Sequence, residues 1–415
     1  MNSPVVVVDP FSSGTEVAPA FAAHGVPAVA VLSAPGLSAQ PWRPGDFAEV
    51  LEHSPAAVHR LRELRPRCVL PGTESGVALA EELTRLLTPR FANEPSLAVA
   101  RRNKGAMQAA LAGAGLPAIR GVCTGDPAVV SRWLAGNGLD RGDLIVKPAE
   151  SAGTDGVTLV PAGTPWRPAF DRLAGATNRL GRVNDDVVVQ ELLTGTEYAV
   201  DTVTVDGRHV LCGIGRYTKR TLGGSAAVYD CTDFIPMDPA VHGPMVAYTY
   251  AALDALGVRW GAAHSEVMMT AGGPRLIETG MRAHGGGHPE YSRLGTGSGQ
   301  LERLAEAFAG PGPVTGDYVQ HTRVRSVFLA APRRGVLRDR ESFTALRGLR
   351  SHYTTRIGYA DGDVVPRTRD LYTIFGLVVL AHPDPDVIEA DYRRVREAES
   401  ALRLIDADPP HEEKP

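Results

Sequence analysis

Hydrophobic residues in the first part of the chain form short continuous runs, and stretches of helical periodicity separate these runs. Three runs are typical of strands that are buried on both faces: 4–9, 27–33 and 67–75. Three stretches have the apolar spacing of helices: 15–25, 56–64 and 76–87. Strands that alternate with helices indicate a parallel sheet, so we expect residues 1–95 to form a small α/β domain.

The first predicted helix should have Thr15 or Ser13 near its N-cap and Gly25 at its C-cap. The loops PFSSG (10–14) and PGTES (71–75) follow two of the predicted strands. Because parallel sheets bind ligands at the carboxyl ends of their strands, both loops are candidates for ligand contact. Plain turns between a strand and a helix are the alternative.

The pattern changes after residue 95. A helix is predicted at 96–117, where a Gly-Leu-Pro sequence ends it. The strands that follow are antiparallel in character, and an Asp206–Gly207 turn joins two of them. These strands are expected at 143–149, 157–160, 186–193, 197–217 and 264–282.

We therefore predict a mixed α/β (α+β) protein with three regions. The middle region, 96–310, consists of a small lobe (about 105–188) and a central lobe (about 189–310). A Gly/Pro-rich connection opens the third region, 311–410, which contains short strands and a charged helix at 384–405. Residues 406–415 are expected to be a disordered tail.

The composition argues against several classes of protein. The chain has 43 Lys and Arg and 47 Asp and Glu, and this net charge of -4 argues against a nucleic-acid partner. No apolar run approaches the roughly 20 residues that span a bilayer, and the N-terminal valines are interpreted as a strand, not a signal peptide. The four cysteines form no CxxC pair, so the cytoplasm is the expected compartment.

Lysine is scarce. Of the 43 basic residues, the lysines are Lys104, Lys147, Lys219 and Lys414. A lysine that persists in an arginine-rich chain indicates a need for a compact ammonium charge. Chance survival is the alternative, and it is our interpretation of Lys414.

The sequence LIVKPAESAGTDGVTLV (144–160) places Lys147 on a strand and a glycine loop directly after it. Glycine lets backbone N–H groups approach phosphate oxygens closely. The loop is not a Walker P-loop, because it lacks the GxxxxGK[ST] pattern and leads into a strand. It is a candidate phosphate-binding loop, with a hairpin turn beside an exposed lysine as the alternative.

The sequence VVVQELLTGTEYAVDTV (187–203) joins a buried strand to two glutamates, Glu191 and Glu197. A strand edge near Leu193 can offer backbone groups to an adenine ring, and Glu197 can accept hydrogen bonds from ribose hydroxyls. Two solvated glutamates are the alternative.

Glu266 and Glu278 lie on two predicted strands joined by TAGGPR, and they can face one another if these strands pair. Paired carboxylates together with phosphate oxygens are typical ligands of Mg²⁺. Arg282 follows beside the glycine run 285–287 and can neutralise the negative charge on a transferred phosphoryl group. Surface charges on a hairpin are the alternative.

Together with NKGAMQAALAGAGLPAIRG (103–121), these sequences occur in an order that resembles the ATP-grasp superfamily, and within it the L-amino-acid ligases. The resemblance covers about 100–290. It implies an ATP-grasp fold with an N-terminal parallel α/β domain and a C-terminal α+β lobe. It also implies a carboxylate–amine ligase that uses ATP and Mg²⁺, or Mn²⁺, to form an amide through an acyl phosphate, with release of ADP and phosphate.

The resemblance assigns roles to individual residues. Those that would hold ATP are Lys104, Lys147, Ser151, Gly153, Thr154, Gly156, Glu191, Leu193 and Glu197. The metal ligands would be Glu266 and Glu278, and Arg282 would stabilise the acyl phosphate. Lys219 and Arg220, which precede Gly223–Gly224, would reach phosphate or a substrate carboxylate.

Two features leave questions open. Gly280 occupies a position where many relatives have Asn as a further metal ligand, so the number of metal ions stays open. Any of the three histidines beside the metal strands, His264, His284 and His288, could orient a substrate, and structural hydrogen bonding is the alternative.

Two other functions also stay open. One is an ATP-grasp ligase or carboxylase of the purine-pathway or biotin-carboxylase type, and the other is an ATP-binding protein without turnover. The presence of both carboxylates and Arg282 favours an enzyme. We expect small, amino-acid-like carboxylate and amine substrates and no membrane partner, while a homodimer is an open alternative to a monomer.

Overall fold

The computed structural model describes residues 3–34, 42–222, 225–310, 312, 314 and 316–406. Gly223–Gly224 and most of the predicted tail, 407–415 with Lys414, lie outside these residues. The chain divides into two compact units. One comprises Met1–Ile214 and Pro236–Val319, and the other comprises Gly215–Ile235 and Gln320–Pro415. The domain boundaries near 95 and 310 stay predictions.

The first unit begins with a parallel sheet in the order β3-β2-β1-β4. Its strands are β1 (Val5–Val8), β2 (Ala28–Leu32), β3 (Glu49–Glu52) and β4 (Cys68–Pro71). Its helices are α1 (Val17–Ala22), α2 (Pro55–Leu64) and α3 (Val77–Leu87). The predicted α/β arrangement is therefore confirmed. β3 was not predicted, because at this edge strand half-buried and exposed residues alternate and no apolar run forms.

The start of the first helix differs from the prediction. A 3-10 turn, η1 (Ser12–Glu16), precedes α1, and neither Thr15 nor Ser13 caps a helix with its side chain. The hydroxyl of Thr15 donates to the carbonyl of Ser12 (2.8 Å), and Ser13 Oγ accepts from the backbone N–H of Gly287 (3.1 Å). Gly25 has a φ of 68°, as a turn after the helix requires.

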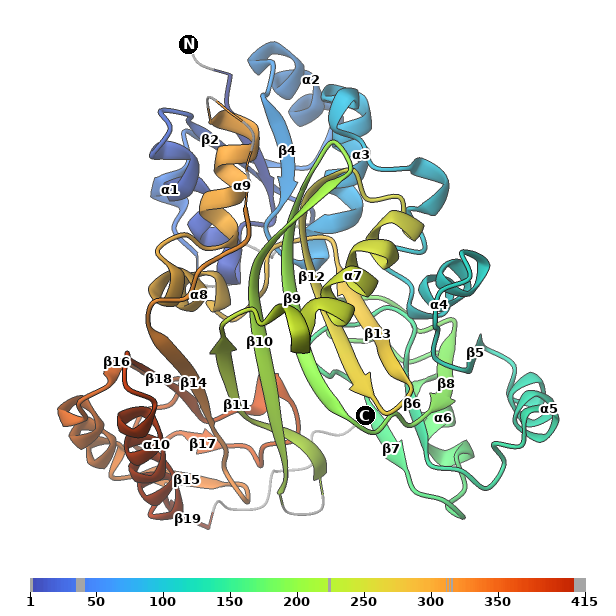
Figure 1. Cartoon of the computed structure of the whole chain (residues 1–415), viewed down its shortest axis with the longest axis vertical. Helices are drawn as coiled ribbons and strands as arrows, with labels where there is room; N and C mark the ends of the chain where they lie inside the picture. Colours follow the sequence, from blue (N-terminus) through green and yellow to red (C-terminus); the bar gives the residue numbers. More distant parts are fainter. Residues whose placement is uncertain are drawn as a thin grey trace. The chain divides into compact units, whose positions relative to one another are not determined.

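A helix from much later in the chain covers one face of the parallel sheet. α9 (Gln300–Ala309) contributes Leu301, Leu304 and Phe308 to the apolar core that contains Val5 and Phe21. In Figure 1 this helix lies beside α1. Each fully buried side chain of this size stabilises the fold by about 1.5–3 kcal/mol. This packing holds the carboxyl ends of the parallel strands near residues 280–300.

A second sheet in the first unit is antiparallel, with the order β5-β8-β6-β7. Its strands are β5 (Gly121–Thr124), β6 (Leu144–Pro148), β7 (Thr158–Val160) and β8 (Val187–Glu191). The helices around it are α4 (Lys104–Gly113), α5 (Pro127–Asn137) and α6 (Arg167–Leu173). The predicted helix at 96–117 is shorter than expected, because Asn103 Oδ1 accepts from the N–H groups of Gly105 and Ala106 and makes Lys104 the first helical residue.

A third group of strands in this unit contains β9 (Thr196–Val205), β12 (Trp260–Thr270) and β13 (Gly273–Gly280) in the order β13-β12-β9. α7 (Pro239–Ala255) and α8 (His288–Thr296) accompany them. The predicted Asp206–Gly207 turn is confirmed, with φ values of 48° and 78°. It leads into β10 (Arg208–Leu222), along which the chain passes into the second unit.

The second unit continues β10 with strands in the order β11-β14-β18-β16 and has a small sheet, β17-β15-β19. These strands are β11 (Ser225–Ile235), β14 (Arg323–Leu329), β15 (Gly335–Arg338), β16 (His352–Ile357), β17 (Val364–Val365), β18 (Gly376–His382) and β19 (Arg403–Ile405). The predicted charged helix is α10 (Pro385–Ser400). It ends before residue 405 because β19 takes up 403–405.

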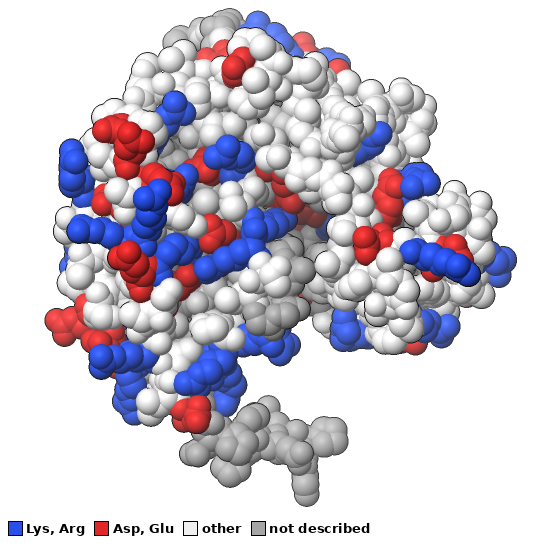
Figure 2. Space-filling view, turned by 60° about the horizontal axis from the view of Figure 1, so that its bottom comes forward, with Lys and Arg blue, Asp and Glu red and all other residues white. Residues whose placement is uncertain are grey.

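On the face that Figure 2 shows, the described Lys and Arg side chains are interspersed with Asp and Glu side chains. Among the described residues, the structure contains no helix of the length and apolarity that a membrane span requires.

Candidate functional site

The two carboxylates that were expected to face one another do so. β12 pairs with β13 in antiparallel fashion, and Glu266 lies directly opposite Glu278. The register shifts after Glu266, since Val267 pairs with Leu276, and Ile277 is therefore the extra residue of a β-bulge. Without this bulge Glu266 would lie opposite Ile277, and the Glu278 side chain would point to the other face of the sheet.

Lys104 connects these carboxylates to the glycine loop. Its side chain is buried, and its Nζ donates to the carbonyl of Ser151 (2.9 Å). The same Nζ lies 3.1 Å from Glu278 Oε2. One ammonium group from the first residue of α4 therefore links β13 to the loop after β6.

Lys147 lies on β6, where its side chain is buried. Burial and the charge of Lys104 lower the pKa of the Lys147 ammonium to about 8. The carboxylates that oppose this shift are those of Glu278, Glu266 and Glu197. Four other residues predicted to bind nucleotide or metal therefore act electrostatically on the Lys147 ammonium group.

The loop at 151–156 lies where it was expected, between β6 and β7, which form an antiparallel pair. Gly153, Thr154 and Gly156 have φ values of 66°, 63° and 72°. Such values are uncommon for a threonine, so this loop has an unusual conformation at Thr154. Its contact with phosphate stays a prediction.

The residues predicted to bind adenine and ribose have different environments. The carboxylate of Glu191, at the end of β8, accepts from Arg120 Nε (2.8 Å) and from the Arg120 backbone N–H (3.0 Å). Leu193 follows in the connection to β9, and Glu197 lies on β9 with a buried side chain. Because the Glu191 carboxylate already accepts hydrogen bonds from Arg120, the backbone near Leu193 is the better candidate for contact with adenine.

Both N-terminal loops singled out in the sequence lie against the segment that follows β13. Arg282 Nε is 3.3 Å from Oε2 of Glu74, a residue of the PGTES loop. In the PFSSG loop, Ser12 Oγ accepts from the N–H of Gly286 (3.1 Å). The sequence did not identify Glu74 itself.

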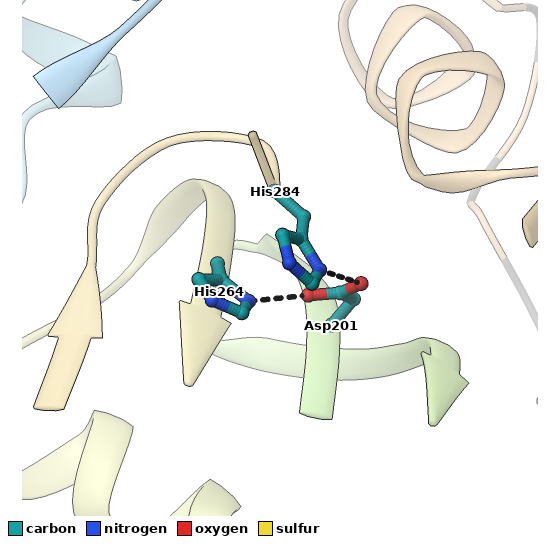
Figure 3. A group of neighbouring side chains, drawn as sticks. All are labelled: Asp201, His264 and His284. Atoms are coloured by element: carbon teal, nitrogen blue, oxygen red, sulfur yellow. Dashed lines mark hydrogen bonds and ion pairs between the residues drawn. The ribbon is translucent and has the colours of Figure 1, made fainter. Parts of the chain in front are cut away.

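Three histidines stack beside the hairpin: His264, His284 and His288. The ring centroids of the first two are 3.6 Å apart, and those of the last two are 3.8 Å apart. Asp201 on β9 accepts from Nδ1 of His264 (2.9 Å) and from Nδ1 of His284 (3.0 Å), as Figure 3 shows. The three stacked histidines come from β12, the segment after β13 and the start of α8, and β9 supplies the Asp201 carboxylate.

The charges within this cluster are complementary. Burial opposes ionisation of Asp201, but His284 and His264 hold the pKa of its carboxyl well below the usual range. Burial also opposes protonation of His264, but hydrogen bonds with Asp201 and Glu266 raise its pKa to about 9. Burial and the charge of His264 lower the pKa of His284 to about 4. The Asp201 carboxylate therefore favours protonation of His264, the histidine whose pKa is raised, and lies between two buried imidazoles.

The ligand atoms of Asp201, His264 and His284 lie within 4.8 Å of one another, a spacing that a metal ion can bridge. Both Nδ1 atoms, however, already donate to the carboxylate. Hydrogen bonds account for the whole group, and we interpret it as a buried anchor beneath the hairpin. A substrate-orienting role of His264 stays a prediction.

Asp201→Asn should lower the free energy of unfolding by about 3 kcal/mol, because it leaves the buried His264 without its counter-charge. The pKa of Asp201 is lowered in the folded state, so its contribution to stability is present above its unfolded pKa of about 3.9 and is lost as the pH falls further. Urea unfolding at pH 7 and at about pH 2, below the unfolded pKa, measures both effects.

The control is Asp254→Asn. Asp254 also pairs with a histidine, His209, at 3.1 Å, but its side chain is 67% exposed. It should change stability by less than about 1 kcal/mol. Equal losses in the two variants would show that the Asp201 cluster is not a buried anchor.

Lys219 and Arg220 lie in the second unit. Arg220 Nη2 contacts Glu399 Oε1 (2.6 Å), and Arg220 Nε lies 3.4 Å from Asp230 Oδ1. Lys219 Nζ lies 4.6 Å from the ring centroid of Tyr229. Two carboxylates of the second unit thus contact Arg220, and an aromatic ring lies beside Lys219. The contact of either cation with a substrate stays a prediction.

Comparison with known proteins agrees with this geometry. Residues 141–289 match the model of the ATP-grasp domain. Dapdiamide A synthase from Enterobacter agglomerans is 29% identical over 422 residues, which cover 97% of this chain and 98% of the relative.

Solved structures share the fold over nearly the whole chain. An L-amino acid ligase from Bacillus licheniformis superposes with a TM-score of 0.77 at 16% identity, covering 98% of this chain and 99% of the ligase. A carboxyaminoimidazole ribonucleotide synthase from Aspergillus clavatus, complexed with ATP, has a TM-score of 0.70 at 14% identity and covers 97% and 100%. Residues 141–289 thus match the ATP-grasp domain, and over nearly its whole length the chain is similar to dapdiamide A synthase and shares the fold of an L-amino acid ligase.

Proposed function

We propose that this protein is an ATP-dependent ligase that joins a carboxylate to an amine, forming an amide or peptide bond between amino-acid-like substrates. The observation that carries the proposal is the position of Glu266 opposite Glu278, with Lys104 in contact with Glu278, on an ATP-grasp domain. The likeness to dapdiamide A synthase over nearly the whole chain supports the same function.

The donor set suits a divalent cation. Glu266 and Glu278 offer carboxylate oxygens from facing positions, and Mg²⁺ in nucleotide sites uses one or two carboxylates together with phosphate oxygens and water. Mg²⁺, or Mn²⁺, would supply positive charge that offsets the charge of the phosphates. Lys104 and Lys147 would hold phosphate oxygens from the other side, and the 151–156 loop would cover them.

The proposed reaction has two steps. An oxygen of the substrate carboxylate attacks the γ-phosphorus of ATP, the bond from that phosphorus to the β–γ bridging oxygen breaks, and its electron pair leaves with ADP. The neutral amine then attacks the acyl carbon, and the carbon–oxygen bond to phosphate breaks. The nitrogen loses its proton to phosphate or water, and the products are the amide, ADP and phosphate.

ADP release, measured against a panel of amino acids as acid and as amine, tests the proposal. We expect release that requires ATP, a divalent cation and both substrates, together with an amide product that mass spectrometry detects. Release that instead requires bicarbonate would indicate the carboxylase type of ATP-grasp enzyme. Binding of ATP without release under any condition would indicate a protein without turnover. We further propose a cytoplasmic location, and a homodimer stays open.

Lys147→Ala should weaken ATP binding by about 10- to 100-fold, because a charged hydrogen bond to phosphate is lost from a buried position. Binding of the acid and the amine should change much less. Lys147→Arg should also impair ATP binding, since a planar guanidinium cannot replace a compact ammonium on a buried strand. Calorimetric titration with ATP measures these effects.

Arg141→Ala is the control, because Arg141 is an exposed cation of the same lobe. Unchanged ATP affinity in both Lys147 variants would contradict a phosphate-binding role of Lys147.

A further inference from the structure

Glu74 is held in place at the carboxyl end of the parallel sheet. It is the first residue of a short 3-10 turn, η4 (Glu74–Gly76), which follows β4. Its neighbours are fixed on either side, since Thr73 Oγ1 donates to the carbonyl of Asp9 (3.1 Å) and Ser75 Oγ donates to the Asp9 carboxylate (2.6 Å). Asp9 is itself fully buried. The loop therefore presents the Glu74 carboxylate at the edge where parallel sheets bind ligands.

The Glu74 carboxylate occupies the space above Gly280. A Cβ atom at Gly280 would lie 3.0 Å from Glu74 Oε2 and 3.4 Å from Arg282 Cζ. Side chains two residues apart on a strand share a face, so position 280 is on the face that carries Glu278. Gly280 thus leaves room for a carboxylate from the N-terminal sheet where relatives often have Asn.

Arg282 is the cation that faces this carboxylate, with Nε 3.3 Å from Glu74 Oε2. The Arg282 Nη1 donates to the carbonyl of Ala283 (3.1 Å). In the proposed reaction, Arg282 stabilises the charge of the reacting acyl group. While it is paired with Glu74, part of its charge is neutralised. A second cation at Glu74 would release the guanidinium for the reacting group.

An α-amino acid carries such a cation. Its ammonium group is one carbon atom away from the carboxylate, so a carboxylate that reacts beside Arg282 brings the ammonium close to Glu74. A carboxylate that is already in place binds an ammonium through charge-assisted hydrogen bonds, which are stronger than neutral ones.

We propose that Glu74 binds the α-ammonium group of the amino acid whose carboxylate becomes phosphorylated. This inference rests on the proposed ligase function. It assigns to the acid site a substrate class, α-amino acids with a free ammonium group, and it excludes N-acylated and desamino acids. It also gives Gly280 a role, because even a Cβ atom at this position would lie 3.0 Å from Glu74 Oε2 and would require this carboxylate to shift.

The test compares an accepted α-amino acid with its desamino analogue, in which hydrogen replaces the amino group. ADP release is measured with the full-length protein, ATP, Mg²⁺ and a fixed amine. In the wild type, the KM for the amino acid should be about 10- to 100-fold lower than the KM for the desamino analogue. Glu74→Gln should remove this preference by raising the KM for the amino acid, while the KM for the desamino acid stays nearly unchanged. Gly280→Ala should act in the same direction.

Glu52→Gln is the control, since Glu52 is an exposed glutamate of the same sheet. Equal KM values for the two acids in the wild type, or an equal rise for both acids in Glu74→Gln, would overturn the proposal and leave Glu74 as a structural partner of Arg282. Thermal unfolding of each variant detects a general loss of structure.

Direct binding separates this inference from the proposed function. If the wild type releases no ADP with any pair of substrates, the ligase function fails. Calorimetric titration of the amino acid and its desamino analogue into the wild type and Glu74→Gln then still decides the role of Glu74. The ammonium site is supported if the wild type binds the amino acid more tightly than its desamino analogue and Glu74→Gln does not. It is contradicted if the amino acid binds equally tightly to the wild type and to Glu74→Gln.

Discussion

Glu278→Gln should reduce ADP release to less than about a thousandth of the wild-type rate. Glu278 faces Glu266 and contacts Lys104, so its charge lies where the nucleotide phosphates and their cation are expected. A metal ion at such a site contributes several kcal/mol of charge stabilisation, which corresponds to about 10³-fold in rate. The amide keeps the shape of the side chain but loses the negative charge that a hard cation requires.

The fold should survive this change, because the Glu278 side chain is 29% exposed and its site is polar. Thermal unfolding without nucleotide should differ little from the wild type, whereas the shift that Mg²⁺ and ATP produce in the wild type should be lost. Glu306→Gln, at an exposed position of α9, is the control. ADP production near the wild-type rate would remove Glu278 from the metal site.

The sequence predicted the main strands of the site because each strand had a clear local signal. Buried apolar runs identified β1, β2, β6 and β8, and the Asp206–Gly207 turn identified the β9–β10 hairpin. The prediction that Glu266 faces Glu278 was less secure, since this arrangement depends on the bulge at Ile277. A bulge adds one residue to one strand, and nothing in the local sequence marked that residue.

Asp201 shows what pattern analysis can miss. It lies in the apolar run YAVDTVTV, and a carboxylate in such a run must be paired if the strand is buried. That signal was present in the sequence. Its partners were not, because His264 and His284 are more than 60 residues away. His264 reaches Asp201 through the pairing of β9 with β12, and His284 reaches it from the segment after β13.

The sequence could not identify Glu74 as a site residue, for a different reason. The PGTES loop was expected at the ligand edge from strand order alone, and contacts of both N-terminal loops with residues 282–287 agree with that expectation. The contact with Arg282 joins residues that are far apart in the sequence and depends on how the parallel sheet packs against the later part of the chain. Such packing is set by the shapes of many side chains, and no motif encodes it.

Arg282→Ala should lower kcat by about 10²–10³-fold, the effect of removing one donor that stabilises a reacting oxyanion. The acyl phosphate and the tetrahedral species formed from it carry negative charge that the ground-state complex has only in part. A fixed guanidinium therefore lowers the barrier more than it strengthens binding. ATP affinity should change little, because Lys104 and Lys147 remain. Steady-state kinetics with saturating ATP, together with ATP titration, measures the two effects.

Arg275→Ala, on the same strand pair, is the matched control, since the Arg275 side chain donates to nearby carbonyls, those of Gly272 and Pro274. If Arg282 anchors a substrate carboxylate and does not act on the reacting charge, the KM for that substrate should rise while kcat stays nearly unchanged. The Glu74 pairing adds a further expectation. In Arg282→Ala the carboxylate of Glu74 loses its cation, so the preference for an α-amino acid over its desamino analogue should increase. Unchanged kcat and KM would place Arg282 outside the reaction and would contradict the site built on the β12–β13 hairpin.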